Sequence, residues 1–280
     1  MGTTKRPASY YFLSIFFACF LLFLYGPMLC VYLLSFQGPE GGMSFPMRGF
    51  STVWFETLFT AGGRGVGDIH NSFFRSLRLG AIVAILTMLI GVAVGMSFRR
   101  RYRGDNFVFY SAIVSMIVPG IFVGFGISLS LNMLGLRPDW WYSGIGAQLT
   151  WSLPFAMLIM FIILGRMDKS YEEAATDLGA SSRQRFQYVI LPLILPGVIG
   201  IFMAGFTSSY EESARAGLNL GTGNTMPMEL TGLLGAATTP VMFAVGTLTT
   251  LSMFTIVILT LLVSASLAKR RQLRLSAQHA

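Results

Sequence analysis

Charged residues are scarce in this chain. Of its 280 residues, 11% are Asp, Glu, Lys or Arg, whereas charged residues make up about a quarter of an ordinary globular domain. Apolar residues make up 54%. A chain with this composition lacks the polar surface of a soluble domain, so the composition favours a membrane protein.

Residues that bind metals or form covalent intermediates are also scarce. The chain has two cysteines, Cys19 and Cys30, and two histidines, His70 and His279. The cysteines share one apolar run and are separated by about 16 Å of helix, which is too far for a disulfide. No set of His, Cys, Ser and Asp residues has the spacing of a metal site or a nucleophilic centre. We therefore predict no metal, no catalytic residues and no enzyme.

A nucleotide-binding loop is missing as well. The chain contains no Gly-x-x-x-x-Gly-Lys-Ser/Thr sequence, in which backbone amides and a lysine hold phosphates. Gly63, Gly65 and Gly67 are spaced like part of a dinucleotide fingerprint, but no strand precedes them. We predict that this chain binds no cofactor, neither ATP nor Mg.

Long apolar runs are what the chain does contain. A helix that crosses a bilayer needs about 20 mainly apolar residues. Six runs reach that length: 10–36, 72–98, 107–134, 144–164, 193–213 and 241–267. The predicted fold is an all-α membrane protein with six transmembrane helices. A shorter apolar segment, 50–59, predicts a small helix at the outer surface.

Two of the prolines in these runs are placed near mid-membrane by the sequence. Pro119, followed by Gly120, and Pro154 each remove a backbone hydrogen bond and predict a kink. A kink suits either a moving gate or static packing, and the sequence leaves both open. Two glycine pairs, Gly91 with Gly95 and Gly120 with Gly124, have the four-residue spacing that favours close helix packing.

Basic residues gather on alternate connections between the runs. That side carries fourteen basic and five acidic residues, a net charge of +9, and the remainder carries six basic and seven acidic, a net charge of −1. Because cytoplasmic loops are enriched in Lys and Arg, this asymmetry predicts that both termini are cytoplasmic. It also explains the basic balance without nucleic acid as a partner. The fourteen are Lys5, Arg6, Arg99, Arg100, Arg101, Arg103, Arg166, Lys169, Arg183, Arg185, Lys269, Arg270, Arg271 and Arg274.

A polar stretch separates the fourth and fifth runs. Residues 172–178 are good helix formers with acids in the first turn, and Gly179 is suited to end that helix. Residues 181–189 begin with serines that can cap a second short helix, and Pro192 opens the next span. The sequence predicts a helix, a glycine elbow and another helix.

This stretch resembles a known motif. Glu173-Ala174-Ala175, then Gly179, then Phe186 and Leu191-Pro192 are similar to the cytoplasmic EAA loop of permease subunits of binding-protein-dependent ABC importers. The resemblance implies a type I ABC importer transmembrane domain whose coupling loop, 166–192, docks on an ATPase. The alternative is an unattached amphipathic loop. The coupling residues that the resemblance implies are Glu172, Glu173, Ala174, Ala175, Gly179, Ala180 and Phe186.

The same resemblance implies the partners and the location. These are an ABC ATPase dimer that binds ATP and Mg, a second permease subunit (homologous and non-identical), a periplasmic solute-binding protein and membrane lipid. The chain would be a multi-pass protein of the bacterial inner membrane. The implied domains are an N-terminal span and periplasmic loop, 1–71, the importer domain, 72–268, and a cytoplasmic tail, 269–280.

A second candidate site lies at the end of the fifth run. Ser208-Ser209-Tyr210-Glu211-Glu212 is similar to a motif of spermidine and putrescine permeases, which implies a substrate path formed by Ser209, Tyr210, Glu211 and Glu212. Carboxylates at membrane depth usually line a polar path or pair with a base. Arg215 is the nearby base, and helical spacing favours its pairing with Glu211, four residues earlier, which leaves Glu212 for the solute.

The substrate is therefore predicted to be a polyamine. Alternatives within the same importer class are an opine-like, amino-acid-derived, phosphonate or iron substrate. A secondary transporter would need coupling-ion groups at mid-membrane, and a membrane-bound enzyme would need clustered catalytic residues; the sequence shows neither.

Overall fold

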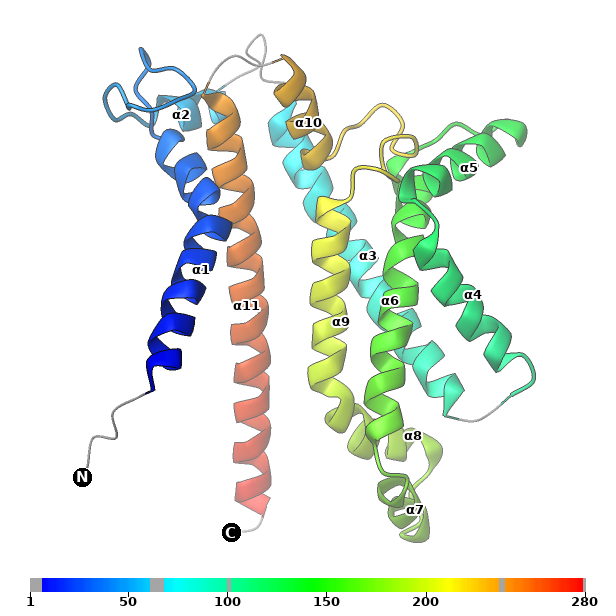
Figure 1. The fold of residues 1–280 in the computed structure, drawn as a ribbon. Helices are drawn as coiled ribbons and strands as arrows, with labels where there is room; N and C mark the ends of the chain where they lie inside the picture. The colour runs from blue at the N-terminus through cyan, green and yellow to red at the C-terminus, as the bar shows by residue number, and fades with distance from the viewer. Residues whose placement is uncertain (1–6, 61–67, 100–101, 237–239, 279–280) are drawn as a thin grey trace. The chain divides into compact units, whose positions relative to one another are not determined.

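A computed structural model describes residues 7–60, 68–99, 102–236 and 240–278, and the regular elements in these ranges are helices (Figure 1). Within them, the one β-type pairing is an isolated bridge between Gln37 and Phe50. The chain divides into two compact units, Met1–Gly67 with Leu230–Ser252, and Asp68–Glu229 with Met253–Ala280. The predicted all-α fold is confirmed. The Gly63, Gly65 and Gly67 pattern lies outside the described residues.

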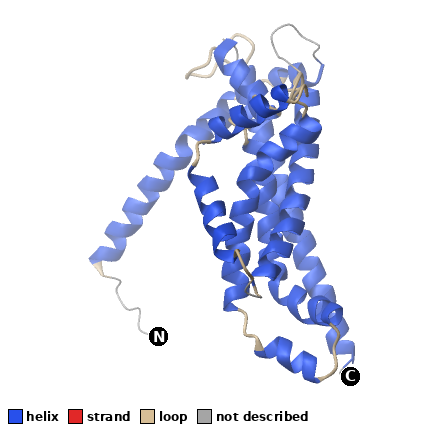
Figure 2. Cartoon of the chain, turned by 90° about the vertical axis from the view of Figure 1, so that its right-hand side faces the viewer, coloured by secondary structure: helices blue, strands red, loops and turns tan. Residues whose placement is uncertain are grey.

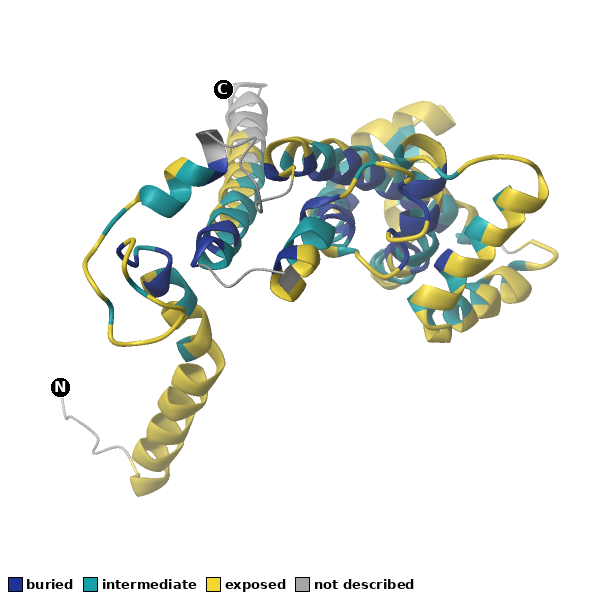
Figure 3. Ribbon diagram, turned by 90° about the horizontal axis from the view of Figure 1, so that it is seen from above, coloured by how far each residue is buried: buried dark blue, intermediate teal, exposed yellow. Residues whose placement is uncertain are grey.

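The first unit begins with a long apolar helix. Helix α1 (Ala8–Leu34) is exposed along most of its length (Figure 3), as expected of a helix that faces lipid or another membrane subunit. The chain after α1 is organised by the buried Gln37, whose side-chain oxygen accepts from the Arg48 amide at 2.8 Å. The predicted short helix in this connection is confirmed as α2 (Val53–Thr60).

Three helices form the core of the second unit. They are α3 (Ile69–Phe98), α6 (Ile145–Arg166) and α9 (Leu191–Glu211), which pack side by side (Figures 1 and 2). Glycines make this packing close: a Cβ on Gly91 would lie 2.9 Å from the Ala156 Cβ, and one on Gly95 would lie 2.6 Å from the Met160 Cβ. The close packing predicted from the Gly91 and Gly95 spacing is confirmed.

The third predicted span is broken. Run 107–134 forms two helices, α4 (Asp105–Ile117) and α5 (Gly120–Met133), which are bent by 106° at the break. Val118 is extended with ψ 125°, because the ring of Pro119 disfavours helical backbone in the preceding residue. The expected kink is therefore a sharp break between two short helices. At Pro154, by contrast, α6 continues through the proline.

The remaining described elements complete the chain. Helix α7 (Ser170–Asp177) is followed by α8 (Ser182–Gln184), a π-helical segment (Arg185–Ile190) and α9, so one helical run covers Ser182–Glu211. Helices α10 (Met226–Ala236) and α11 (Val241–Gln278) follow. Five helices in the described ranges are long and apolar enough to cross a membrane, or six if the bent pair forms one span. The domain boundaries at 71/72 and 268/269 stay a prediction.

Candidate functional site

The first half of the coupling loop, 166–192, folds as the sequence predicts, whereas its second helix continues into α9 and does not end before Pro192. Helix α7 ends at Gly179, which has φ +79°, a left-handed conformation that favours glycine. The Gly179 amide donates to the Thr176 carbonyl at 2.8 Å, and the Ala180 amide donates to the Ala175 carbonyl at 2.9 Å. These two bonds are the Schellman arrangement that closes a helix and turns the chain. The glycine elbow is confirmed.

The second half of the coupling loop starts at a capped helix end. Ser181 accepts from the Gln184 amide at 3.4 Å, and the Gln184 side chain accepts in return from the Ser181 amide at 2.8 Å. This reciprocal capping box satisfies two amides that would otherwise lack partners. Phe186 then turns toward the apolar cluster formed by α6 and α9. The segment is thus joined to the membrane helices through its apolar side.

Polar contacts also join the two halves of the loop. Arg185 donates to the Thr176 hydroxyl at 2.7 Å. Before α7, the Ser170 amide donates to Asp168 at 2.9 Å, and this hydrogen bond holds the pKa of the exposed Asp168 carboxyl below its usual value. The loop is therefore a folded structure, with its ends fixed, rather than a loose connection.

The tip of the elbow presents an unusual surface. Glu173, Ala174 and Gly179 are exposed, and a Cβ added at Gly179 would meet no atom within 4 Å. Leu178 is 89% exposed although it is apolar. A single exposed apolar side chain is normal on a protein surface, so Leu178 points to a docking surface only together with the small residues beside it. Sequence reasoning did not single out Leu178, although an apolar residue between Asp177 and the elbow glycine was the available signal.

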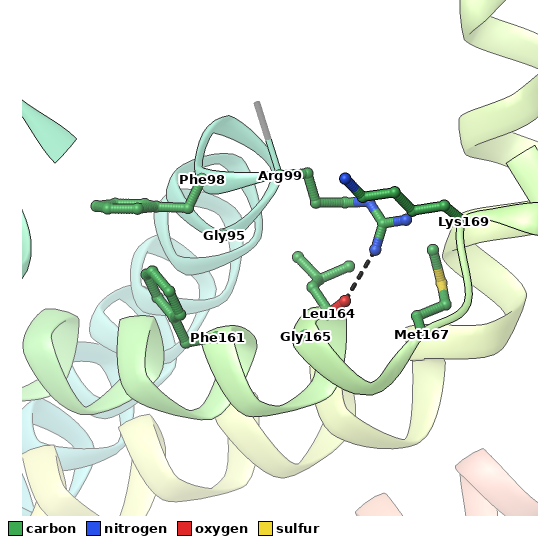
Figure 4. A pocket seen from close by; sticks show the side chains of 8 residues that line it. All are labelled: Gly95, Phe98, Arg99, Phe161, Leu164, Gly165, Met167 and Lys169. Atoms are coloured by element: carbon green, nitrogen blue, oxygen red, sulfur yellow. Dashed lines mark hydrogen bonds between the residues drawn. The ribbon is translucent and has the colours of Figure 1, made fainter. Parts of the chain in front are cut away.

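Glu172 faces the opposite way from the exposed tip. Its carboxylate forms an ion pair with Arg99 at the end of α3. Arg99 also donates through Nη1 to the Leu164 carbonyl near the end of α6, at 2.8 Å (Figure 4). One guanidinium therefore joins α3, α6 and α7. We call this contact the Arg99 junction.

The Arg99 junction borders a cavity. The cavity has a volume of about 240 Å³ and lies between the ends of α3 and α6. Figure 4 shows its lining: Phe98 and Phe161 on one side, Arg99 and Lys169 on the other. The side chains of Arg99 and Glu172 are 10% and 23% exposed, so their charges are largely removed from water. Under these conditions the pair is more strongly coupled than a surface ion pair.

The second candidate site lies at the far end of α9. Ser209 is buried and donates to the Gln148 side-chain oxygen on α6, and Tyr210 is 1% exposed. The ring of Tyr210 stacks on that of Phe206 at 6.0 Å. Glu211, the last residue of α9, is exposed. Ser209 and Tyr210 therefore pack within the helix core, while the acidic residues lie at its edge.

The expected pairing of Arg215 with Glu211 is wrong, and so is the expectation that Glu212 is left unpaired. Arg215 pairs with Glu212: its Nη1 lies 2.9 Å from the Glu212 Oε2, and its backbone amide donates to Oε1 at 2.9 Å. Helix α9 ends at Glu211, and Glu212 is extended with ψ 119°. Because the helix has ended, the four-residue spacing rule no longer describes which side chains meet.

Arg215 is buried in a site built from several helices. Its guanidinium carbon lies 5.0 Å from the centre of the Trp151 ring. A Cβ on Gly120 would lie 2.7 Å from the Arg215 Nη1, and one on Gly124 would lie 2.9 Å from its carbonyl oxygen. The spacing of Gly120 and Gly124 thus accommodates this arginine rather than another helix. Asn219 donates to the carbonyls of Gly124 and Arg215, at 2.9 Å each.

Sequence reasoning missed several residues of these two sites. Trp151, Gln148 and Asn219 were not singled out, and neither was the link from Arg99 to Glu172. Their contacts join segments far apart in the chain; Ser209 and Gln148, for example, are 61 residues apart. A polar residue inside an apolar run, such as Gln148, was the one usable signal.

Comparisons with known proteins identify the family. The family described as "Binding-protein-dependent transport system inner membrane component" matches residues 87–272. The spermidine/putrescine transport system permease protein PotC of Haemophilus influenzae is 27% identical over 244 residues, covering 86% of this chain and 92% of that protein. The putrescine transport system permease protein PotI of Escherichia coli K12 is 26% identical over 238 residues, covering 81% of each.

Solved structures share the fold. A bacterial ABC transporter involved in import of the acidic polysaccharide alginate has a TM-score of 0.68 at 16% identity, covering 92% of this chain and 94% of its own. The MetNI methionine ABC transporter in an inward facing conformation has a TM-score of 0.57 at 16% identity, covering 71% and 95%. The predicted type I ABC importer fold is confirmed, and the chain is a permease subunit of such an importer. It belongs to the family of binding-protein-dependent transport system inner membrane components.

Proposed function

We propose that this permease forms half of a translocation path, with a second permease as the other half. Two ATPase subunits bind ATP and Mg beneath it, and a periplasmic binding protein delivers the solute. The observation that carries the proposal is the geometry of the coupling loop: a capped helix and elbow that expose a small-residue surface and are fixed to the membrane helices by the Arg99 junction.

In this proposal the exposed side of the loop meets the ATPase. Glu173, Ala174, Ala175, Gly179 and Ala180 form the docking surface, and their small side chains allow close approach of the partner. Phe186 supports the surface from inside the apolar cluster. Glu172, which was expected to contact the ATPase, takes an internal role because its carboxylate is paired with Arg99.

Movement of the ATPase then reaches the membrane helices by two routes. One is the uninterrupted helical run Ser182–Glu211. The other is the Arg99 junction, which links α7 to the ends of α3 and α6. Nucleotide binding favours one arrangement of these helices over another, so transport follows from a shift in their populations.

The orientation follows from charge. With the coupling loop and both termini in the cytoplasm, the basic side of +9 faces inward, as the positive-inside rule requires. Lys5, Arg6, Arg100 and Arg101, which contribute to that charge, lie outside the described residues. Reporter fusions after Ser182 and within 38–42 should report cytoplasm and periplasm, respectively. A periplasmic signal at Ser182 would contradict the orientation.

We propose that the solute is a polyamine. The named substrates of PotC and PotI, at 26–27% identity over more than four-fifths of this chain, support this choice. Glu211 is exposed at the end of α9, next to Glu212, which is paired with Arg215. A cation that loses hydration there needs compensating negative charge. Ser209 and Tyr210 support the helix end from within the core.

The test is uptake by the reconstituted complex. The permease pair and its ATPases are reconstituted into vesicles that contain ATP, and the cognate binding protein is added outside. The entry of labelled putrescine and spermidine into the vesicles is then measured. We expect uptake that requires ATP and the binding protein. Uptake of an opine-like or phosphonate compound in place of both polyamines would overturn the substrate and leave the importer function intact.

A further inference from the structure

The buried arginine at the end of α9 occupies a site with the chemistry of an organic-cation receptor. We propose that Glu212 and Trp151 form a binding site for the ammonium group of the solute, and that Arg215 fills this site until the solute displaces it. The inference rests on the proposed function in one respect, namely that the solute is a cation.

Arg215 contacts both a carboxylate and an aromatic ring. The Glu212 carboxylate accepts from the guanidinium at 2.9 Å, and the Trp151 ring centre lies 5.0 Å from the guanidinium carbon. A carboxylate combined with an aromatic face attracts organic cations, because the charge and the ring quadrupole act on the same group. The side chains of Arg215 and Glu212 are 9% and 12% exposed, so both charges act with little screening by water.

The space that the Arg215 side chain fills is bordered by two glycines. Gly120 and Gly124 line it, and a Cβ at Gly120 would lie 2.7 Å from the Arg215 Nη1. An arginine side chain is a run of methylenes that ends in a cation, and an alkyl-ammonium likewise joins a methylene chain to a cation. A diamine entering this space would therefore meet the same carboxylate and the same ring.

The resident arginine is bound incompletely. Its Nε is buried and has no hydrogen-bond partner in the described part of the chain. An unsatisfied buried donor makes the arginine-filled state less stable than a fully bonded one. A replacement cation with its own satisfied donors can therefore compete for Glu212.

Exchange of one cation for another avoids an uncompensated charge. A buried carboxylate without a counter-ion is strongly destabilised, so Glu212 requires a cation in either state. A neutral or anionic solute cannot replace Arg215 at this site. The exchange would thus select for cations at this site.

The alternative is that Arg215 is a fixed structural clamp. The two accounts differ in what happens when the arginine is removed. If Arg215 stands in for the solute, Arg215→Gln leaves a vacant site that an added amine fills. If Arg215 is only a clamp, the same substitution loosens the loop and creates no affinity for amines.

The experiment measures direct binding of putrescine to the purified permease–ATPase complex, without the binding protein, by isothermal calorimetry. We expect Arg215→Gln to bind putrescine at least tenfold more tightly than the wild-type complex. The double variant Glu212→Gln with Arg215→Gln carries neither charge of this pair and is the matched control; it should assemble and show no such gain. Adding Trp151→Leu to Arg215→Gln should reduce the gain.

Equal putrescine affinity in the wild-type complex and Arg215→Gln would overturn the inference. If Arg215→Gln does not assemble, Arg215→Lys provides the second test, because it keeps the charge and loses the planar contact with Trp151. Tighter putrescine binding by Arg215→Lys than by wild type supports the exchange, and unchanged binding contradicts it. If the wild-type complex takes up putrescine but the Arg215 variants bind it no more tightly than wild type, only this site is rejected. If the wild-type complex takes up no polyamine, the proposed substrate is rejected.

Discussion

Replacing Arg99 with glutamine should uncouple ATP hydrolysis from transport. The substitution removes the ion pair with Glu172 and weakens the bond to the Leu164 carbonyl. The shorter, uncharged glutamine side chain could not hold α3, α6 and α7 together. Helix α7 would then remain folded, because its end is closed by its own backbone bonds at Gly179, but it would no longer be fixed to α3.

The size of the expected energy loss in Arg99→Gln depends on how deeply the Arg99–Glu172 ion pair is buried. Removing one partner of a fully buried ion pair costs about 3–5 kcal/mol, and an exposed pair is worth about 0.2–1 kcal/mol. With the Arg99 and Glu172 side chains 10% and 23% exposed, we expect a loss of about 1.5–2.5 kcal/mol, between these limits. Since about 1.4 kcal/mol corresponds to tenfold, the population of α7 in its fixed orientation should fall by at least about tenfold.

The assay is a double-mutant cycle in reconstituted vesicles. Arg99→Gln, Glu172→Gln and the double variant are compared for solute uptake and for ATP hydrolysis stimulated by the binding protein. Uptake should fall by about tenfold in each single variant, with little further loss in the double variant, because both singles break one contact. Arg103→Gln, an exposed arginine on the same connection, should have no effect. Wild-type uptake by Arg99→Gln, or additive losses in the double variant, would refute a role for the junction in coupling.

Three further changes test other parts of the account. Gly95→Leu forces a Cβ to within 2.6 Å of the Met160 Cβ and should lower the free energy of unfolding by about 1–3 kcal/mol. The melting temperature of the purified complex should fall accordingly. Gly165→Ala is the control: its Cβ would meet no atom within 4 Å, so the melting temperature should not change. The Gly179→Asp variant should insert and assemble but lose the ATP hydrolysis that the binding protein stimulates. Gly179→Asn should lose less of it, because asparagine adopts φ +79° more readily. Full stimulation in both variants would reject the docking surface. Leu178→Ser should leave folding unaffected, because the side chain is 89% exposed, and should reduce co-purification of the ATPase; undiminished co-purification would place Leu178 outside the contact.

The features that sequence predicted well are governed by local rules. The elbow at Gly179 needed only a left-handed glycine between two short helices, and the apolar runs predicted the long helices within a few residues at most ends. The start of the fifth span was predicted less well, since the helical run begins at Ser182. There, a capping box starts the helix well before the chain becomes apolar.

The features that sequence missed depend on tertiary contacts. Pro119 predicted a kink, whereas the structure has a 106° bend, and Arg215 packs against Gly120 and Gly124 just after it. The pairing of Arg215 was predicted from helical spacing, which failed because α9 ends at Glu211. The Arg99 junction joins side chains from separate helices, and no spacing rule identifies such a partner in a single sequence.

The central claim is that this permease carries a polyamine through an ATP-driven complex. The most direct measurement is uptake of labelled putrescine and spermidine into vesicles that hold the complete complex, with ATP inside and the binding protein outside. The account predicts uptake of at least one polyamine that stops when ATP is replaced by a non-hydrolysable analogue. Uptake that continues unchanged without ATP hydrolysis and follows an ion gradient instead would contradict it.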